Sequence, residues 1–244
     1  MEITSYSGFL TKDGHFRLVG EVKNNEAINI TNVRIKIELF DSNDNLIRTE
    51  EQGIELAVLL SGRKSPFAFM TTNETEATLI ENYNVELIGY EQSFEEKAQK
   101  LEIIWHAQGN VSIYGRIDNT GFEESHFTRV LATFYDENRE VIEVSVSQII
   151  FSLSPADYYI FEIFFSKDIA EKARWYSLTA ESQEYTIKKE IEDDFITNSE
   201  SGSSTDIYYI FGILIGFSAV VLIIAILIAR RKHKRKMRRR TKQK

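Results

Sequence analysis

Hydrophobic and polar residues alternate along much of the chain before residue 190. In residues 16–22 every second position is apolar or Gly, and the same period of two recurs in residues 33–39. This period is typical of β-strands that turn one face toward a core. Asp- and Asn-rich runs at 41–45 and 136–140 provide turn residues between such strands. The pattern predicts an all-β body made of short strands and regularly spaced turns.

A continuous apolar segment follows this body and contains no charged residue. As an α-helix, residues 207–229 would span about 34 Å, enough to cross a hydrocarbon layer of about 30 Å. Two tyrosines stand at one end, where aromatic rings favour lipid headgroups, and a G-x-x-x-G pair would let two helices pack as a homodimer. We predict a transmembrane helix in a lipid bilayer, with the anchor residues Ile207, Tyr208, Tyr209, Gly212, Gly216 and Ala229.

Charge is strongly segregated along the chain. All 37 Asp and Glu precede residue 207, whereas 11 of the 29 Lys and Arg lie in residues 230–244. The acidic body argues against nucleic acid as a partner, because phosphate binding needs clustered positive charge. Positive residues beside a membrane helix stay on the cytoplasmic side, where they attract anionic lipid headgroups. We therefore expect a single-pass cell-membrane protein with extracytoplasmic domains and a cytoplasmic basic tail that includes Arg230, Arg231, Lys232, Lys234, Arg235, Lys236, Arg238, Arg239 and Arg240.

Two features leave alternatives open. The basic run could be a nuclear localisation or nucleic-acid patch, although its contact with the apolar segment favours a stop-transfer role. Residues 1–16 lack the basic n-region, the apolar h-region and the small-residue cleavage site of a signal peptide. Export of the domains would then need a start upstream of Met1, an unusual route or a reversed topology, and of these we expect the upstream start.

The body contains an internal repeat at an offset of 95 residues. Residues 14–24 match residues 109–119, and the match gives two identical glycine positions and one identical asparagine position. At slightly shorter offsets the alignment pairs Leu60 with Leu153, Phe67 with Ile160, and Leu87 with Leu178. Such a register indicates duplication of one structural unit of roughly 85–95 residues.

Each unit carries the same short motifs. The first has Gly20-Glu-Val-Lys-Asn24, Ile37-Glu-Leu-Phe-Asp41, and Leu60-Ser-Gly before Phe67-Ala-Phe69. The second has Gly115-Arg-Ile-Asp-Asn119, Ala132-Thr-Phe-Tyr-Asp136, and Leu153-Ser-Pro155 before Ile160-Phe-Glu-Ile-Phe164. These motifs resemble those of the FxLYD domain family, which has a G-x-V-x-N strand start, an F-x-L-Y-D-like motif and a Leu-Pro-Gly-like turn before an F-x-F strand. Departures from the motif occur at Ile37, Phe40, Ala132 and Pro155, the last standing where the first unit has Gly62.

The resemblance covers most of residues 5–184 and implies immunoglobulin-like β-sandwiches, common on microbial and often archaeal surface proteins, with no enzymatic activity to carry over. The expected fold is all-β: two tandem immunoglobulin-like β-sandwich domains followed by one transmembrane α-helix. Weak helix signals occur only at 92–100 and 167–174 before the anchor. The expected parts are a first sandwich (1–91), a connector (92–100), a second sandwich (101–187), an acidic Ser-rich stalk (188–206), the membrane helix (207–229) and the basic tail (230–244).

The sequence offers little that points to catalysis or to a cofactor. It has no cysteine, and its four histidines form no pair with metal-ligand spacing. Asp41, Asn43 and Asn45 look like the start of a Ca²⁺ loop, but Leu46 and Gln52 stand where an EF-hand needs Gly and Glu. Hairpin turn chemistry is the simpler interpretation, with a weaker Ca²⁺ contact as the alternative. We expect no enzyme, no cofactor and no metal site.

An aromatic-rich strand supplies the candidate binding patch, for which we select Tyr158, Tyr159 and Phe161. The leading hypothesis is a membrane-anchored, non-enzymatic surface or envelope protein whose tandem sandwiches bind a protein or envelope partner. A second hypothesis is an accessory subunit of a larger membrane complex, acting through its membrane helix and basic tail. A third is a membrane-tethered hydrolase, which requires a cleft with converging carboxylates.

Overall fold

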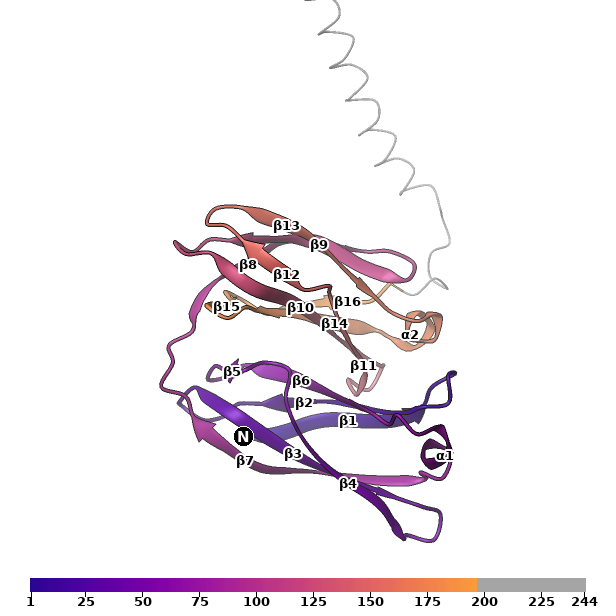
Figure 1. Cartoon of the computed structure of the whole chain (residues 1–244). Coiled ribbons are helices and arrows are strands. Elements are labelled where there is room, and N and C mark those ends of the chain that lie inside the picture. The colour runs from indigo at the N-terminus through magenta and orange to yellow at the C-terminus, as the bar shows by residue number, and fades with distance from the viewer. Residues whose placement is uncertain (197–244) are drawn as a thin grey trace, which may run out of the picture. The chain divides into compact units, whose positions relative to one another are not determined.

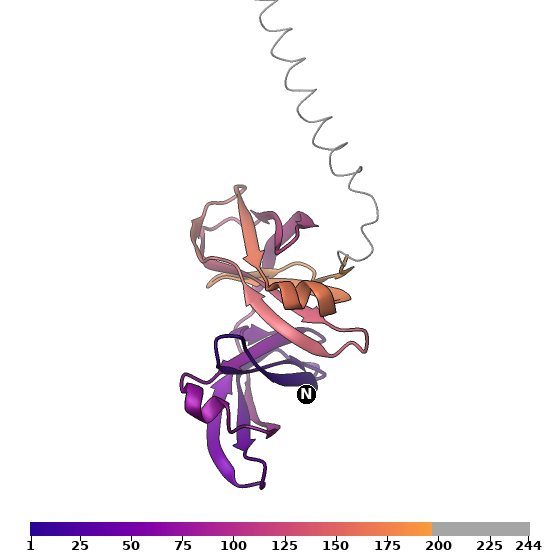
Figure 2. The ribbon, with the colours of Figure 1, turned by 90° about the vertical axis from the view of Figure 1, so that its right-hand side faces the viewer.

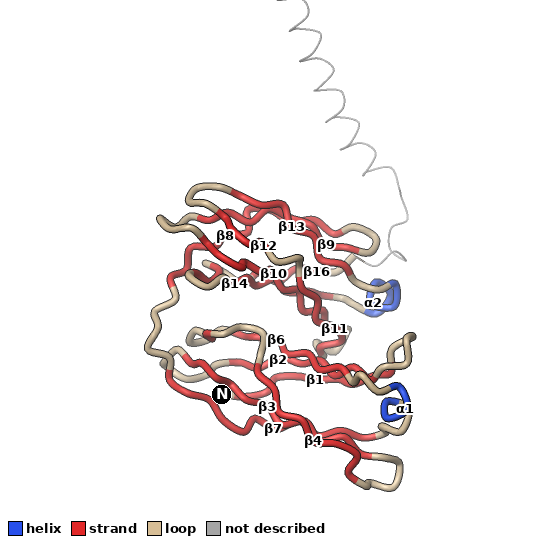
Figure 3. The backbone as a smooth tube through the Cα atoms, in the orientation of Figure 1, coloured by secondary structure: helices blue, strands red, loops and turns tan. Residues whose placement is uncertain are grey.

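The computed structural model describes residues 1–196, and the predicted membrane helix and basic tail lie outside them. Within residues 1–196 the protein contains 16 strands and two short helices, which confirms the predicted all-β class (Figure 3). No helix in this part of the chain is long and apolar enough to cross a membrane.

Two sheets pack face to face in the first half of the body (Figure 1). One sheet has the order β1 (Glu2–Leu10), β2 (Phe16–Lys23), β6 (Lys64–Met70). The other contains β4 (Leu46–Gly53), β3 (Ile30–Phe40), β5 (Val58–Leu59) and β7 (Asn82–Gln92), and α1 (Glu74–Ala77) precedes β7. The core between them is formed by the residues that the period of two selects, among them Phe16, Leu18, Val22, Ile35, Ile37 and Leu39.

The second half is one nine-stranded sheet that folds over its own core. One layer contains β8 (Ala98–Gln108), β9 (Ser112–Asn119) and β13 (Tyr158–Phe164). The other contains β11 (Val141–Val146), β10 (Ser125–Tyr135), β14 (Trp175–Glu181), β12 (Ile150–Leu153) and β16 (Ile191–Asp194), and β15 (Tyr185–Ile187) connects the layers by pairing with both β14 and β8. Helix α2 (Lys167–Lys172) confirms the helix signal at 167–174, whereas residues 93–97 between β7 and β8 are not helical.

The two halves repeat the same buried hydrogen bonds. The side-chain amide of Asn24 donates to the carbonyls of Ile28 and Leu59, at 2.8 and 3.0 Å. The amide of Asn119 donates in the same way to Glu123 and Leu153, at 2.8 and 2.9 Å. Each asparagine therefore ties a loop and the last residue of a short strand, β5 or β12, to the end of β2 or β9, which explains why both units carry Asn at this position.

A glycine in each half lies under an aromatic ring. Gly20 pairs with Phe67 across β2 and β6, and Gly115 pairs with Phe161 across β9 and β13. A Cβ atom on Gly115 would lie 2.6 Å from the carbonyl oxygen of Trp105 and 2.7 Å from Cζ of Phe161. The first position of the G-x-V pattern is therefore glycine because any side chain there would overlap the aromatic ring. The third position, Val22 or Ile117, is apolar because it is buried in the core.

These pairings correct the register that we assigned to the repeat. Phe67 corresponds to Phe161 and not to Ile160, because both rings cover the equivalent glycine. Leu59, not Leu60, corresponds to Leu153, because these two carbonyls accept the equivalent asparagine bonds. Leu178 corresponds to Val85 and not to Leu87, because Leu178 pairs with Ala132 and Val85 pairs with Ile37, the equivalent of Ala132. Neighbouring apolar residues fit either register in sequence, and only strand pairing distinguishes them.

The boundary of the second unit also differs from the prediction. We assigned residues 188–206 to a flexible stalk, yet β16 (Ile191–Asp194) pairs with β14 and Phe195 is buried in the second core. The ring of Phe195 packs 5.3 Å from that of Phe165, centroid to centroid. One aromatic side chain with a large buried area outweighs the acidic composition around it, so the stalk prediction is wrong for residues 191–195. The remainder, 197–206, lies outside the described residues.

The outer faces of two sheets meet between the halves, so that four layers stack (Figures 1 and 2). An apolar cluster joins Val19 of β2 to Tyr135, Val141 and Val144 of β10 and β11. The hydroxyl of Tyr135 donates to the buried carboxylate of Glu21 at 2.6 Å, and burial raises the pKa of that hydroxyl, which keeps it protonated. The two halves are therefore held by a fully packed interface and not by the connector alone.

We expect Gly115→Ala to lower the free energy of unfolding by about 1–3 kcal/mol, because the added methyl group overlaps backbone and the Phe161 ring. Gly53→Ala is the matched control, since the nearest atom to its Cβ is the Val33 carbonyl oxygen at 3.6 Å. Urea unfolding followed by circular dichroism measures both. Equal stability of the two variants would contradict the steric role of Gly115.

Candidate protein-binding face

The outermost layer, formed by β8, β9 and β13, has one face in the second core and a second face that is uncovered within residues 1–196. Along β13 the side chains alternate, with Phe161 and Ile163 in the core and Tyr158, Ile160 and Phe164 outside. Six large apolar side chains on this uncovered face are 36–64 % exposed. We call it the open face and define it by Ile104, Trp105, Tyr114, Arg116, Tyr158, Ile160 and Phe164.

Only one residue of the predicted patch belongs to the open face. Tyr158 is 51 % exposed. Tyr159 packs against the second core, and its hydroxyl accepts a hydrogen bond from Gln148 at 2.6 Å. Phe161 is fully buried over Gly115. Of the three predicted residues, Tyr158 is therefore exposed, whereas Tyr159 and Phe161 pack against the core, and the exposed neighbours Ile160 and Phe164 were not part of the prediction.

A β-bulge places two successive large side chains of β8 on the open face. The register with β9 shifts between Ile103 and Trp105, so Ile104 has no partner of its own. Ile103 is buried, whereas Ile104 and Trp105 are 50 % and 42 % exposed. The Trp105 ring meets Tyr114 of β9 edge to face, with 6.2 Å between centroids. The bulge thus adds an indole to a surface that strict alternation would have left smaller.

Arg116 is held in a fixed orientation at the centre of the open face. Its guanidinium donates two hydrogen bonds to Asp118, at 2.6 and 2.8 Å, and these raise the pKa of Arg116 above its ordinary value. The same group lies 4.1 Å from the centroid of the Tyr158 ring. Stacking and forked bonding restrict the rotamers of this side chain, so a contact made by it would cost little additional rotamer entropy.

Part of this site could have been found in the sequence. Alternation along residues 112–119 places Tyr114, Arg116 and Asp118 on one side of a strand, as the structure has them. Nothing in the sequence shows that Tyr158 lies beside this strand, or that the register of β8 shifts at Ile104.

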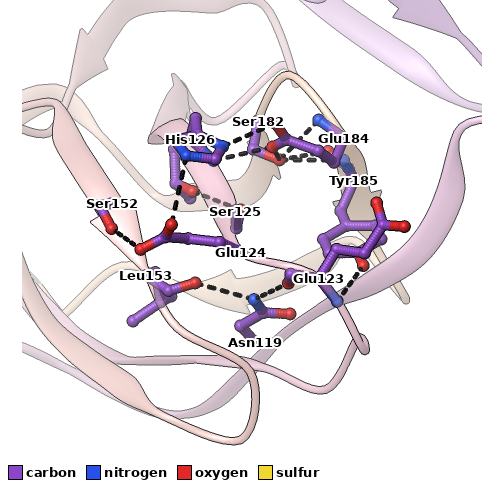
Figure 4. Close-up of polar contacts among 11 residues, drawn as sticks. Asn119, Glu123, Glu124, Ser125, His126, Ser152, Leu153, Ser182, Glu184 and Tyr185 are labelled. Carbon is purple, nitrogen blue, oxygen red and sulfur yellow. Dashed lines mark hydrogen bonds and ion pairs between the residues drawn. The ribbon is translucent and has the colours of Figure 1, made fainter.

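A second polar cluster surrounds His126, between β10 and the turn before β15 (Figure 4). Its Nδ1 lies 2.8 Å from Glu184 Oε1, its Nε2 lies 3.4 Å from Glu124 Oε2, and its backbone N–H donates to Glu184 at 2.7 Å. Ser152 donates to Glu124, and Ser182 bonds Glu184. Both ring nitrogens face carboxylates, so no hydroxyl is placed for activation as in a Ser-His-Asp arrangement. The cluster fastens loops together.

The side chains of the candidate Ca²⁺ residues form hydrogen bonds within their own turns. The Asp41 carboxylate accepts hydrogen bonds from the backbone N–H groups of Asn43 and Asn45, at 2.8 and 2.9 Å. Asp136 accepts from Asn138 and Glu140 at 2.9 Å each. Hairpin turn chemistry therefore accounts for both runs. Within residues 1–196 no group of three or more His, Cys, Asp or Glu is arranged to hold a metal ion.

A cleft of about 520 Å³ lies between β1 and the segment around α2. Its acidic side chains include Glu143, which is paired with Arg17 at 2.6 Å, and Asp168, which is paired with Lys12 at 2.8 Å. Both carboxylates pair with basic side chains of the first half, so these ion pairs also link the two halves.

No protein-family model and no curated protein matches this sequence. Among solved structures, the chain is similar to a transglutaminase of red sea bream, with 8 % identity over 80 % of this chain and 31 % of that one, and a TM-score of 0.29. A β-glucuronidase from glycoside hydrolase family 2 matches with 11 % identity, 74 % and 24 % coverage, and a TM-score of 0.25. A β-glucosidase from Kluyveromyces marxianus matches with 10 % identity, 75 % and 45 % coverage, and a TM-score of 0.22. The chain spans less than half the length of each of these proteins.

The His126 cluster makes stability depend on pH. The hydrogen bond to Glu184 raises the pKa of His126 above 6.5, so its contribution is complete below that pH and disappears as the pH rises through the folded-state value. We expect the urea midpoint difference between the natural chain and His126→Gln to be largest near pH 6 and to vanish by about pH 9. Glu184→Gln should show the same trend, and a difference independent of pH would contradict the charged pair.

Proposed function

We propose that this chain is a membrane-anchored, non-enzymatic surface protein that binds a protein partner through the open face. The observation that carries this proposal is the concentration of Trp105, Tyr114, Tyr158 and Arg116 on one exposed sheet face. Trp, Tyr and Arg are the residue types that contribute most binding energy in protein interfaces, and contiguous exposed apolar surface is characteristic of interaction sites.

The rigidity of the face supports a binding role. The aromatic side chains rise from paired strands and not from loops, since β9 is bonded to both β8 and β13. Trp105 and Tyr114 pack on one another, and Arg116 is held by Asp118 and Tyr158. A partner therefore meets a surface that is ordered in advance, which reduces the entropic cost of association.

We further propose that the two halves are immunoglobulin-like sandwiches of the FxLYD type. The support is that the motif residues have matching physical roles in both halves: Gly20 and Gly115 lie under aromatic rings, and Asn24 and Asn119 donate to equivalent backbone carbonyls. The membrane anchor and its orientation rest on the apolar segment and the eleven basic residues after it.

The orientation can be measured by protease protection on intact cells that carry a tag after Lys244. We expect the sandwiches to be digested and the tag to be protected, because the positive-inside rule retains the basic tail in the cytoplasm. Permeabilised cells, in which the tag must be lost, are the control. Protected sandwiches with a digested tag would show the reverse topology and would remove the surface role.

The binding role can be tested with a photo-crosslinking phenylalanine derivative at position 158, in the chain's own membrane. We expect discrete crosslinked protein bands at this site that disappear when Ile160→Lys is added, because Ile160 pairs beside Arg116 on the open face. The matched control places the same probe at Thr49, an exposed position of β4. Bands of equal intensity at 158 and 49, or none at 158, would contradict binding through the open face.

A further inference from the structure

The open face is the structural equivalent of a face that the protein already buries. Because Gly20 corresponds to Gly115, the outward residues Val19 and Glu21 of β2 correspond to Tyr114 and Arg116 of β9. In the first half these outward residues contact the second half: Val19 in the apolar cluster, and Glu21 through the Tyr135 hydroxyl at 2.6 Å.

The neighbouring strands show the same equivalence. Phe67 corresponds to Phe161, so Lys64 of β6 corresponds to Tyr158 of β13. Lys64 forms a 3.0 Å ion pair with Glu21, as Tyr158 stacks on Arg116.

The bulge is also repeated. The register of β1 shifts between Ile3 and Ser5, opposite Glu21, and the register of β8 shifts between Ile103 and Trp105, opposite Arg116. Ser5 lies in the interface, where its hydroxyl accepts from the backbone N–H of Val141 at 2.8 Å. Trp105 is its counterpart on the open face.

The surface that covers the first half is neutral at its centre and charged at one end, where Arg129 and Glu181 bond Glu55, Ala57 and Val58 of the first half. It comes from β10 and β14, and Leu131, Thr133 and Thr179 on it are at most 6 % exposed. Leu131 packs among apolar residues of the first half. The central part of this face consists of aliphatic and hydroxyl side chains, with the Tyr135 hydroxyl opposite Glu21.

The equivalent surface of the first half, on β3 and β7, carries charged side chains that pair with one another. Register places Lys36, Glu38 and Glu86 at the positions of Leu131, Thr133 and Thr179. Lys36 pairs with Glu38 at 3.4 Å and with Glu86 at 2.8 Å. A polar outer face of this kind is characteristic of the terminal unit of a stack. The stack is thus closed at its first half and uncovered at its second.

We propose that the open face receives the outer face of a further β-sandwich domain, supplied by a partner protein and docked as the second half docks on the first. The partner surface should carry aliphatic and hydroxyl side chains, with a hydrogen-bond acceptor opposite Arg116. A second copy in head-to-tail order does not fit this description, because its available outer face carries the Lys36 ion pairs. The proposal rests on the binding function proposed above and names the kind of partner.

The experiment uses an altered copy of the full chain as a donor probe, in mild detergent. Lys36→Leu, Glu38→Thr and Glu86→Thr give the first half the side chains of Leu131, Thr133 and Thr179. Trp105→Asp and Ile160→Lys close the donor's own open face. The acceptor is the natural chain, and sedimentation velocity measures association. We expect a one-to-one complex, weakened roughly tenfold or more when the acceptor carries Ile160→Lys.

A substitution outside the open face serves as the control. Phe151→Lys in the acceptor changes an exposed aromatic residue of β12 outside the open face and should leave the complex intact. A donor that melts like the natural chain but forms no complex overturns the proposal. If crosslinks at position 158 persist in that case, the open face binds a partner of another shape, and only the sandwich inference fails. A natural-chain dimer that Ile160→Lys separates would assign the face to a second copy and would also overturn it.

Discussion

Strand β10 is covered on both of its faces, and the arrangement of the other layers depends on this. Val130 and Phe134 point into the core of the second half, while Leu131 and Tyr135 point toward the first half, and none is more than 4 % exposed. A strand that is apolar on both sides requires a layer on each side. The first half supplies the second layer, and without it this strand would expose a large apolar surface to water.

Covering that face also buries charge, which determines how the halves are oriented. Glu181 accepts hydrogen bonds from the backbone N–H groups of Ala57 and Val58, at 2.8 and 3.2 Å, and an ion pair from Lys97 at 2.8 Å. A buried carboxylate that loses its partners costs about 3–5 kcal/mol, so shifted arrangements of the two halves are strongly disfavoured. Apolar contact provides the attraction, and these directional bonds select one geometry.

The two halves share equivalent strand pairings and buried hydrogen bonds but present two different outer faces. On the face formed by β3 and β7, Lys36 stands at the position that Leu131 has on the face formed by β10 and β14. On the opposite sheets, Val19 of β2 stands at the position of Tyr114 of β9. The first half therefore presents ion pairs to solvent and buries its small residues, whereas the second half buries its neutral face and presents aromatic side chains. This difference between equivalent surfaces is the basis on which we propose that the second half binds a partner.

The sequence by itself determined the class of the fold, the repeat, the core positions of the early strands and the use of Asp41 and Asp136 in turns, because these depend on local period and on short-range hydrogen bonds. Tertiary structure alone decided the register that matches Phe67 with Phe161, the burial of Phe195 and the assembly of the open face. Adjacent apolar residues such as Ile160 and Phe161 satisfy the same pattern, so the partner strand decides which side chain turns inward. Which sheet face stays uncovered depends on how two whole sandwiches pack, and that is a property of surfaces brought together from distant parts of the chain.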